Sequence, residues 1–284
     1  MATNRELYFE LKNLVPNKID ESAVKLILLD VNGFETFSEL VKHFDDEAKN
    51  IDSFRQIVAK IMSGMPVQYA IGHAPFLDLD LKVNSDVLIP RPETEELVLF
   101  AVSMIKKECD FVNGFSIVDV GTGTGAIAIS IYRRIVNSDV IAIDISPSAL
   151  EIAKENSKKY GAKIKFYQGD MLRPLVNDNV KADIIISNPP YIEDEKTIDE
   201  NVYRNEPHLA LMAKPATKYY EEIFKNAPIV TKRRSLMFFE IGEKMEESLT
   251  ELIKKYLPLA SYEFHKDIYN RTRFLYVRND KYED

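Results

Sequence analysis

Two short segments of this chain combine residue types that could bind a ligand and act on it. The first is a glycine-rich loop, Gly121-Thr122-Gly123-Thr124-Gly125, which directly follows an apolar run at 115–120. Glycines let the backbone turn sharply and let a ligand approach it closely, at the positive end of the helix that follows. We therefore interpret this loop as a nucleotide-binding site.

Carboxylates after the next two apolar runs support this interpretation. Asp144 follows the run at 139–143, where an acid can accept both ribose hydroxyls of an adenosine. Asp170 follows the run at 164–167, and we expect it near an adenine, with Met171 packed on the ring. Two alternatives stay open for the loop. In the first, the glycine spacing belongs to an NAD-dependent oxidoreductase, which it also fits. In the second, the glycines only form a tight structural turn and bind no ligand.

The second segment is Asn188-Pro189-Pro190-Tyr191, which ends the apolar run at 182–186. Pro189 excludes Asn188 from the helical region and so aims its side-chain carbonyl in a fixed direction. The Pro189 carbonyl has no expected helix or sheet partner, so the turn offers two acceptors, which suit the two hydrogens of a planar amino group. Tyr191 supplies a ring face for a planar target or for a cationic methyl donor.

A planar amino group is a poor nucleophile because its lone pair is delocalised. Two hydrogen bonds accepted from its hydrogens raise the electron density on nitrogen, and a sulfonium-bound methyl held in line supplies a strong electrophile. The two segments together predict methyl transfer to nitrogen without a strong general base, and they disfavour the NAD hypothesis. Four histidines are scattered, with neither metal nor triad spacing: His43, His73, His208 and His265.

These segments need a scaffold of alternating strands and helices. Ser146-Pro147 predicts the start of one helix and Tyr160-Gly161 its end. Repeated strand–helix units predict an α/β fold, a mostly parallel sheet with helices on both faces, in which the first and fourth strands adjoin. That order brings the glycine loop and the proline turn to one crevice. Later strands are expected near 236–241, 260–264 and 273–277.

Residues 1–72 show helical periodicity instead. We expect a small helical bundle, which either docks a partner or serves only stability or oligomerisation. Strict alternation from Leu77 to Val83 and the short run at 87–89 predict a hairpin that links two domains. The acidic residues after Pro92 predict a helix reaching about Glu108. The four expected bundle helices contain Leu7 to Leu14, Val24 to Val31, Thr36 to Phe44, and Phe54 to Met62 with an end at Gly64.

Composition excludes several classes of protein. With 45% hydrophobic residues, the 284-residue chain is neither disordered nor fibrous. Residues 1–110 hold 19 acidic and 12 basic side chains, a poor match for extended nucleic-acid binding. One cysteine, Cys109, excludes an internal disulfide and a cysteine-rich zinc site. No apolar run has the length of a membrane helix and the first residues lack the order of a signal peptide, so we expect a cytoplasmic protein.

Three segments together resemble the peptide chain release factor glutamine N5-methyltransferases (the HemK/PrmC family): 87–95, 119–125 and 188–191. Further matches are Gln68-Tyr69-x-x-Gly72, Glu206-Pro207-x-x-Ala210-Leu211 and Glu240-Ile241-Gly242. The resemblance covers nearly the whole chain. The Asn-Pro-Pro-Tyr turn alone is shared with DNA and RNA amino-methyltransferases, which remain the alternative. Asn205, where an aromatic residue is expected, and Asn270, where glycine is expected, depart from the family pattern.

The resemblance implies a helical domain at 1–72 that docks the release factor, a hairpin linker at 73–92, and a Rossmann-like class I methyltransferase domain at 93–284. It implies S-adenosyl-L-methionine as cofactor and S-adenosyl-L-homocysteine as product. The methyl acceptor would be N5 of the glutamine in the Gly-Gly-Gln motif of class 1 release factors, which act in translation termination. We expect a monomer with no membrane, nucleic-acid or metal partner.

The candidate catalytic residues are Asn188, Pro189 and Tyr191. The candidate cofactor-binding residues are Gly121, Thr122, Gly123, Thr124, Gly125, Asp144, Asp170, Met171 and Asn188. The candidate substrate-binding residues are Asn188, Pro189, Pro190, Tyr191, Arg91 and Glu93. Arg91, Glu93 and Thr94 fall at the segment between the domains, where they either border the entrance of the pocket or only cap the following helix.

Overall fold

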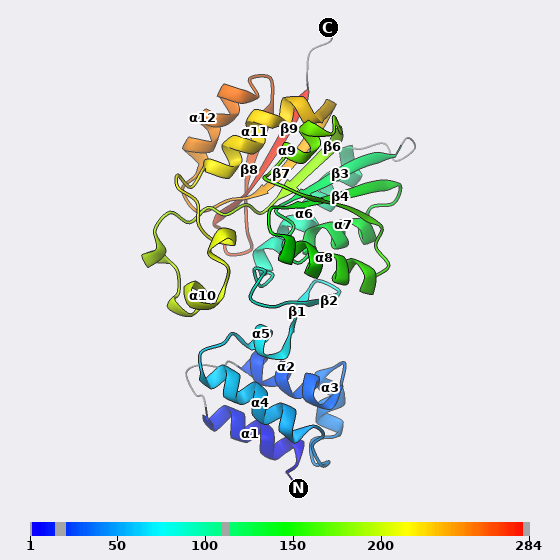
Figure 1. The fold of residues 1–284 in the computed structure, drawn as a ribbon, viewed down its shortest axis with the longest axis vertical. Helices are drawn as coiled ribbons and strands as arrows, with labels where there is room; N and C mark the ends of the chain where they lie inside the picture. The colour runs from blue at the N-terminus through cyan, green and yellow to red at the C-terminus, as the bar shows by residue number, and fades with distance from the viewer. Residues whose placement is uncertain (1, 15–20, 109–113, 281–284) are drawn as a thin grey trace. The chain divides into compact units, whose positions relative to one another are not determined.

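The structure is a computed structural model that describes residues 2–14, 21–108 and 114–280 (Figure 1). The chain divides into two compact units, the first made of Met1–His73 and Glu200–Asn205, the second of Ala74–Asp199 and Glu206–Asp284. Cys109 lies outside the described residues.

The first unit is a helical bundle around an apolar core that includes Leu11, Ile27 and Phe54. Its helices are α1 (Asn4–Leu14), α2 (Glu21–Asn32), α3 (Phe37–Lys42), α4 (Ile51–Met62), α5 (Val67–Ile71) and α10 (Glu200–Asn205). The four expected helices are present, and Gly64 takes the left-handed conformation just beyond the fourth. The short helices α5 and α10 were not expected. Asn205 ends α10 and donates through Nδ2 to the Gly64 carbonyl at 2.9 Å.

The hairpin consists of β1 (His73–Phe76) and β2 (Leu79–Lys82). The expected strand from Leu77 to Val83 was wrong at its start, because Leu77 has a φ of +52° and lies in the turn between the two strands. The run at 87–89 was wrongly expected to be a strand. It is irregular, since the Ile89 amide donates to the Glu206 carboxylate at 3.1 Å rather than to a strand partner.

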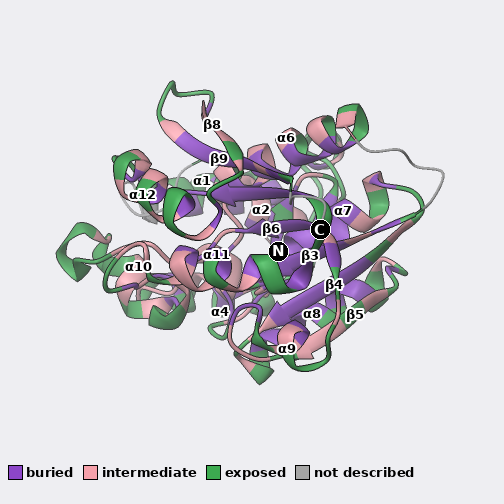
Figure 2. Cartoon of the chain, turned by 90° about the horizontal axis from the view of Figure 1, so that it is seen from above, coloured by how far each residue is buried: buried purple, intermediate pink, exposed green. Residues whose placement is uncertain are grey.

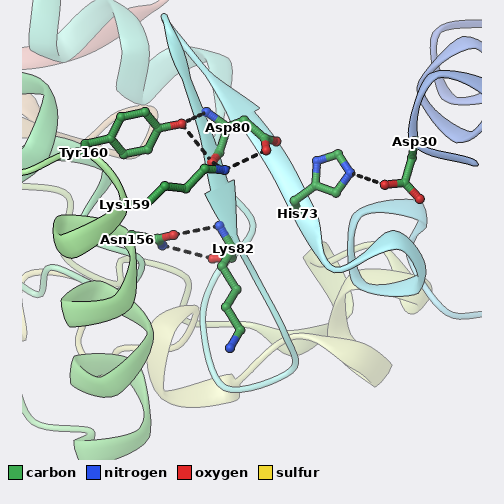
Figure 3. A network of polar contacts seen from close by, with 7 residues as sticks. All are labelled: Asp30, His73, Asp80, Lys82, Asn156, Lys159 and Tyr160. Atoms are coloured by element: carbon green, nitrogen blue, oxygen red, sulfur yellow. Dashed lines mark hydrogen bonds and ion pairs between the residues drawn. The ribbon is translucent and has the colours of Figure 1, made fainter. Parts of the chain in front are cut away.

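In the second unit, helix α8 (Pro147–Lys159) holds the second hairpin strand (Figure 3). Asn156 accepts a hydrogen bond from the Lys82 amide at 2.7 Å and donates to the Lys82 carbonyl at 3.1 Å. The Tyr160 hydroxyl accepts from the Asp80 amide at 2.6 Å. As expected, Ser146 caps the start of α8 by accepting from the Ala149 amide, and Tyr160 is its C-cap. Strand β2 is therefore held against α8 by hydrogen bonds with Asn156 and Tyr160.

The second unit is built on a seven-stranded sheet of order β5-β4-β3-β6-β7-β9-β8. Its strands are β3 (Phe115–Val120), β4 (Ser138–Asp144), β5 (Ile164–Gln168), β6 (Ala182–Ser187), β7 (Thr231–Glu240), β8 (Ser261–Lys266) and β9 (Thr272–Asp280). The strands from β3 to β7 are parallel, and β9 is antiparallel to both of its neighbours. The expected pairing of first and fourth strands is confirmed by β3 against β6, with Val120 opposite Ser187.

Helices cover both faces of this sheet, and its inner strands are largely buried between them (Figure 2), whereas the edge strands β5 and β8 have no fully buried residue. One face packs on α6 (Pro92–Glu108) and α7 (Ala126–Arg134). The other packs on α9 (Arg173–Asn177), α11 (Lys218–Val230) and α12 (Glu246–Tyr256). Single 3₁₀ turns lie at Glu195–Thr197 and His208–Ala210. The alternation of side chains along each strand explains the two layers, since Ile117 faces one core and Val118 the other.

Asn270, which stands where glycine is expected, lies in the turn between β8 and β9. Its φ is +64°, the left-handed conformation in which asparagine replaces glycine at low cost. In the three described ranges, no helix is both long and apolar enough to cross a membrane.

Candidate active site

A cavity of about 410 Å³ lies at the carboxyl ends of the parallel strands. Gly121 and Gly123 follow β3, Asp144 ends β4, Asp170 follows β5 and Asn188 follows β6, and all five line the cavity. Ligands of open α/β sheets bind at this edge, where the strand order reverses. The wall is completed by Asp86, Val87, Leu88, Ile145, Ser146, Ala149, Gly169, Met171, Arg173, Pro190, Pro207, Leu209, Ala210, Lys218, Tyr219 and Glu222.

The three glycines of the loop all have positive φ, but they serve different purposes. At Gly121 and Gly123 a Cβ atom would meet nothing within 4 Å, so both leave open space beside the cavity. At Gly125 a Cβ atom would lie 3.1 Å from Ile129 Cδ1 and 3.4 Å from Ala153. Gly125 therefore allows α7 and α8 to pack closely, whereas the other two allow a ligand to approach the backbone.

Thr122 and Thr124 are buried and do not line the cavity. The Thr122 hydroxyl donates to Asp119 Oδ2 at 2.6 Å, and the Thr124 carbonyl accepts from Asn156 Nδ2 at 2.9 Å. These two contacts fix the shape of the glycine loop from behind. Burial raises the pKa of Asp119 to about 7, although hydrogen bonds from Thr122 and the Ala128 amide lower it.

Asp144 braces the loop from the next strand. Its Oδ2 accepts from the Gly123 amide at 2.8 Å, and its Oδ1 accepts from the Ser146 amide at 2.9 Å. Burial raises the pKa of Asp144, and these backbone donors lower it. Each carboxylate oxygen can accept more than one hydrogen bond, so both keep acceptor capacity for a ligand in the cavity.

Asp170 and Met171 form the neighbouring part of the wall. Asp170 is partly exposed and lies 3.5 Å from an Arg173 nitrogen. Met171 is buried and has a φ of +47°. The structure thus brings both residues to the cavity that Asp144 borders.

The proline turn contributes Asn188 and Pro190 to the wall, while Pro189 is buried. Asn188 Nδ2 donates to the Thr94 hydroxyl at 2.9 Å, and Thr94 donates to Glu240 Oε2 at 2.7 Å. The Asn188 amide nitrogen is therefore already engaged.

Tyr191 does not line the cavity either. Its ring fills the space beside Gly242, where a Cβ atom would come within 2.9 Å of the ring. Its hydroxyl lies 3.4 Å from Glu240 Oε1. Burial, followed by the nearby Glu240 charge, raises the Tyr191 pKa, so the hydroxyl stays protonated near neutral pH.

Arg91 and Glu93 lie outside the cavity lining. The Arg91 guanidinium donates to Glu206 Oε1 at 2.6 Å, which joins the segments on either side of the cavity. Glu93 lies in the first turn of α6, within electrostatic range of Glu240 and Arg273. Across the described residues, no group of three or more His, Cys, Asp or Glu side chains is arranged to hold a metal ion.

Comparison with known proteins identifies the family. A family model described as a methyltransferase domain matches residues 112–252. The release factor glutamine methyltransferase of Bacillus subtilis (strain 168) is 38% identical over 89% of this chain and 90% of that protein. The chain belongs to the release factor glutamine methyltransferase family. The Staphylococcus aureus (strain NCTC 8325 / PS 47) protein of the same name is 34% identical over 97% of this chain and 99% of its own length.

A solved methyltransferase from Pyrococcus furiosus shares the fold of this family member. The TM-score is 0.53 at 16% identity, and the match covers 78% of this chain and 98% of that one. The expected Rossmann-like class I methyltransferase fold is therefore confirmed. The relatives in sequence and the family model show that the chain is a methyltransferase.

Two buried polar residues of this methyltransferase were missing from the residues proposed for its site: Glu206 and Glu240. Thr94, also buried, was expected at the pocket entrance or as a helix cap, and its contact with Asn188 was not foreseen. A signal existed for Glu240, because it is the one acid in an apolar run at 236–241. Buried carboxylates need partners, but the sequence does not reveal that the partner of Glu240 is Thr94. The wall segment at 207–222 carried no signal beyond the match at Glu206-Pro207-x-x-Ala210-Leu211.

Proposed function

We propose that this enzyme transfers a methyl group from S-adenosyl-L-methionine to N5 of the glutamine in the Gly-Gly-Gln motif of class 1 peptide chain release factors. The observation that carries the proposal is the position of Asn188 on the wall of the same cavity as Gly123 and Asp144. The residues expected to bind the nucleotide part of the cofactor and the side chain expected to accept hydrogen bonds from the substrate amide therefore line the same cavity. The names of the related proteins support the choice of substrate.

The residues of the cavity fit the proposed cofactor. Gly121 and Gly123 leave open space beside the backbone, and Asp144 keeps acceptor capacity for two ribose hydroxyls. Asp170 and Met171 would face the adenine. When bound, the cofactor supplies an electrophilic methyl group and leaves as S-adenosyl-L-homocysteine.

In this proposal the chain's own residues bind and orient the glutamine amide. Asn188 Oδ1 and the Pro189 carbonyl accept its two hydrogens, and Pro190 forms part of the wall. Tyr191 supports the turn from behind, because its ring fills the space that Gly242 leaves. A carbon–nitrogen bond forms as the carbon–sulfur bond breaks, and the nitrogen then releases one proton to water, so no strong base is needed.

We also propose that residues 1–72 dock the release factor and that 73–92 link them to a catalytic domain at 93–284. The helical unit has its own apolar core and is separate from the cavity, which supports a role other than catalysis. The proposed substrate places the enzyme in the cytoplasm. We propose a monomer that acts on protein rather than nucleic acid.

The test uses the full chain with labelled S-adenosyl-L-methionine. Release factor, total RNA and DNA are offered separately, and the labelled polymer is identified. We expect label only on the release factor, and at least a hundredfold loss of turnover in Asn188→Ala, with affinity for S-adenosyl-L-homocysteine kept. Label on RNA or DNA would instead support an amino-methyltransferase of nucleic acid. Nicotinamide-nucleotide binding without affinity for S-adenosyl-L-homocysteine would contradict both.

A further inference from the structure

We infer that Thr94 and Glu240 are positioning residues, which determine that the carbonyl end of the Asn188 amide, and not its NH2 end, is presented to the substrate. This inference rests on the proposed function, because only an acceptor at Asn188 suits a glutamine amide. It assigns a role to two residues that do not line the cavity.

The three residues come from three separate elements of the second unit. Thr94 lies in the first turn of α6, Asn188 directly follows β6, and Glu240 ends β7. The Thr94 side chain is buried and lies between the other two, 2.9 Å from Asn188 Nδ2 and 2.7 Å from Glu240 Oε2. Glu240 is also buried. The contacts thus form a short chain from the interior to the cavity wall.

The direction of these hydrogen bonds follows from what each group can donate. An ionised carboxylate only accepts, so the single hydroxyl proton of Thr94 must go to Glu240. The Thr94 oxygen is then left as an acceptor, and only the NH2 end of Asn188 can donate to it. Asn188 Oδ1 therefore faces away from Thr94. If the Asn188 amide were reversed, its Oδ1 would face the Thr94 oxygen, and two acceptors would meet. Its NH2 group would then face the NH2 group of the substrate amide, and two donors would meet.

The ionisation of Glu240 controls this direction. The groups that face it are Glu93 of α6, Arg273 of β9, and the hydroxyl of Tyr191. The Tyr220 hydroxyl of α11 donates to the Glu240 backbone carbonyl at 2.7 Å. Burial raises the pKa of Glu240 to about 7, while Thr94 and the Arg273 charge lower it and Glu93 raises it.

A protonated Glu240 carries a donor of its own. It can then donate to Thr94, whose hydroxyl proton becomes free to point at Asn188 and to bind its carbonyl oxygen. Orientation of the Asn188 amide should therefore weaken in mildly acidic solution.

The experiment compares Thr94→Val, which keeps the shape but removes the hydroxyl, with Thr94→Ser, which keeps the hydroxyl. For Thr94→Val we expect kcat on the release factor to fall about tenfold, the factor that one ordinary hydrogen bond supplies. The KM for release factor and the Kd for S-adenosyl-L-homocysteine should change less than twofold. Thr94→Ser should restore most of the lost turnover.

Two further measurements separate positioning from packing. The wild-type kcat should rise with pH through about 7 as Glu240 ionises, and this rise should disappear in Thr94→Val. In free protein, the side-chain NH2 signal of Asn188, assigned by its loss in Asn188→Ala, should be protected from hydrogen exchange in wild type and unprotected in Thr94→Val.

Equal kcat, pH profile and NH2 protection in wild type and Thr94→Val would overturn the inference. It would also be overturned if Thr94→Ser lost as much turnover as Thr94→Val, since Thr94 would then only fill space. Failure of the proposed function has a different signature. Wild type would then methylate no release factor, while the NH2 protection would still depend on the Thr94 hydroxyl.

Discussion

Arg91 and Glu206 form an ion pair with 2.6 Å between Nη2 and Oε1, and the Glu206 side chain is only 1% exposed. The second oxygen of Glu206 accepts from the Ile89 amide at 3.1 Å. One buried carboxylate therefore holds two segments far apart in sequence, which supply Val87 and Pro207 to the cavity wall. The segment at 87–95 and the Glu206-Pro207 motif, which are far apart in the sequence, therefore contact each other in the fold.

Removing one partner of this pair should be costly. Arg91→Ala leaves Glu206 buried without its counter-charge, and we expect a loss of about 3 kcal/mol in the free energy of unfolding. The double variant Arg91→Ala/Glu206→Gln should regain part of that loss, because the uncompensated charge is gone. Denaturant unfolding of both variants and of Glu206→Gln alone completes the cycle. Strictly additive losses would show that the pair is not coupled.

Asp144 and Asp170, two of the acids on the cavity wall, should differ in their effect on cofactor binding. In Asp144→Asn, the side-chain oxygen can accept from only one of the two backbone N–H groups, that of Gly123 or that of Ser146. The remaining N–H group then faces the new side-chain NH2 group. We expect S-adenosyl-L-homocysteine affinity to fall at least tenfold by calorimetry. Asp170→Asn is the matched control, since Asp170 is partly exposed and faces Arg173 at 3.5 Å. A larger loss at Asp170 than at Asp144 would refute this ranking.

The glycine loop should separate stability from ligand binding. Gly125→Ala introduces a Cβ 3.1 Å from Ile129 at a φ of +83°, so both crowding and backbone strain destabilise the fold, by about 2 kcal/mol. Gly123→Ala carries strain at a φ of +53° but meets open space. It should lose less stability and more affinity for S-adenosyl-L-homocysteine. Thermal unfolding and calorimetry on the two variants give the comparison, and the opposite order would exclude these roles.

Stability should depend on pH through Asp119. Its pKa is raised by burial to about 7 in the folded chain, so the folded state holds a proton that the unfolded state has already released. The free energy of unfolding should therefore fall as pH rises from about 4 to about 7, by about 1.4 kcal/mol per pH unit at most. Asp119→Asn keeps an acceptor for Thr122 and removes the charge. In this variant, the free energy of unfolding should change less with pH between about 4 and about 7. An unchanged pH dependence would show that groups other than Asp119 cause it.

Local features of this protein were predictable from its sequence. The cap at Ser146, the end of α8 near Gly161, the left-handed Asn270 and the glycine loop each depend on a few consecutive residues. Turn and cap conformations are determined by neighbouring side chains and by the freedom of glycine. The alternating apolar runs likewise indicated the parallel sheet and the adjacency of β3 and β6.

Long-range partners were decided only by the tertiary structure. The run at 87–89 looked like a strand, yet the Ile89 amide pairs with Glu206, and the hairpin forms from β1 and β2 instead. Nothing near Thr94 in the sequence indicates that it contacts both Asn188 and Glu240. Buried polar groups must find partners wherever packing places them, and that choice belongs to the whole fold rather than to any short segment.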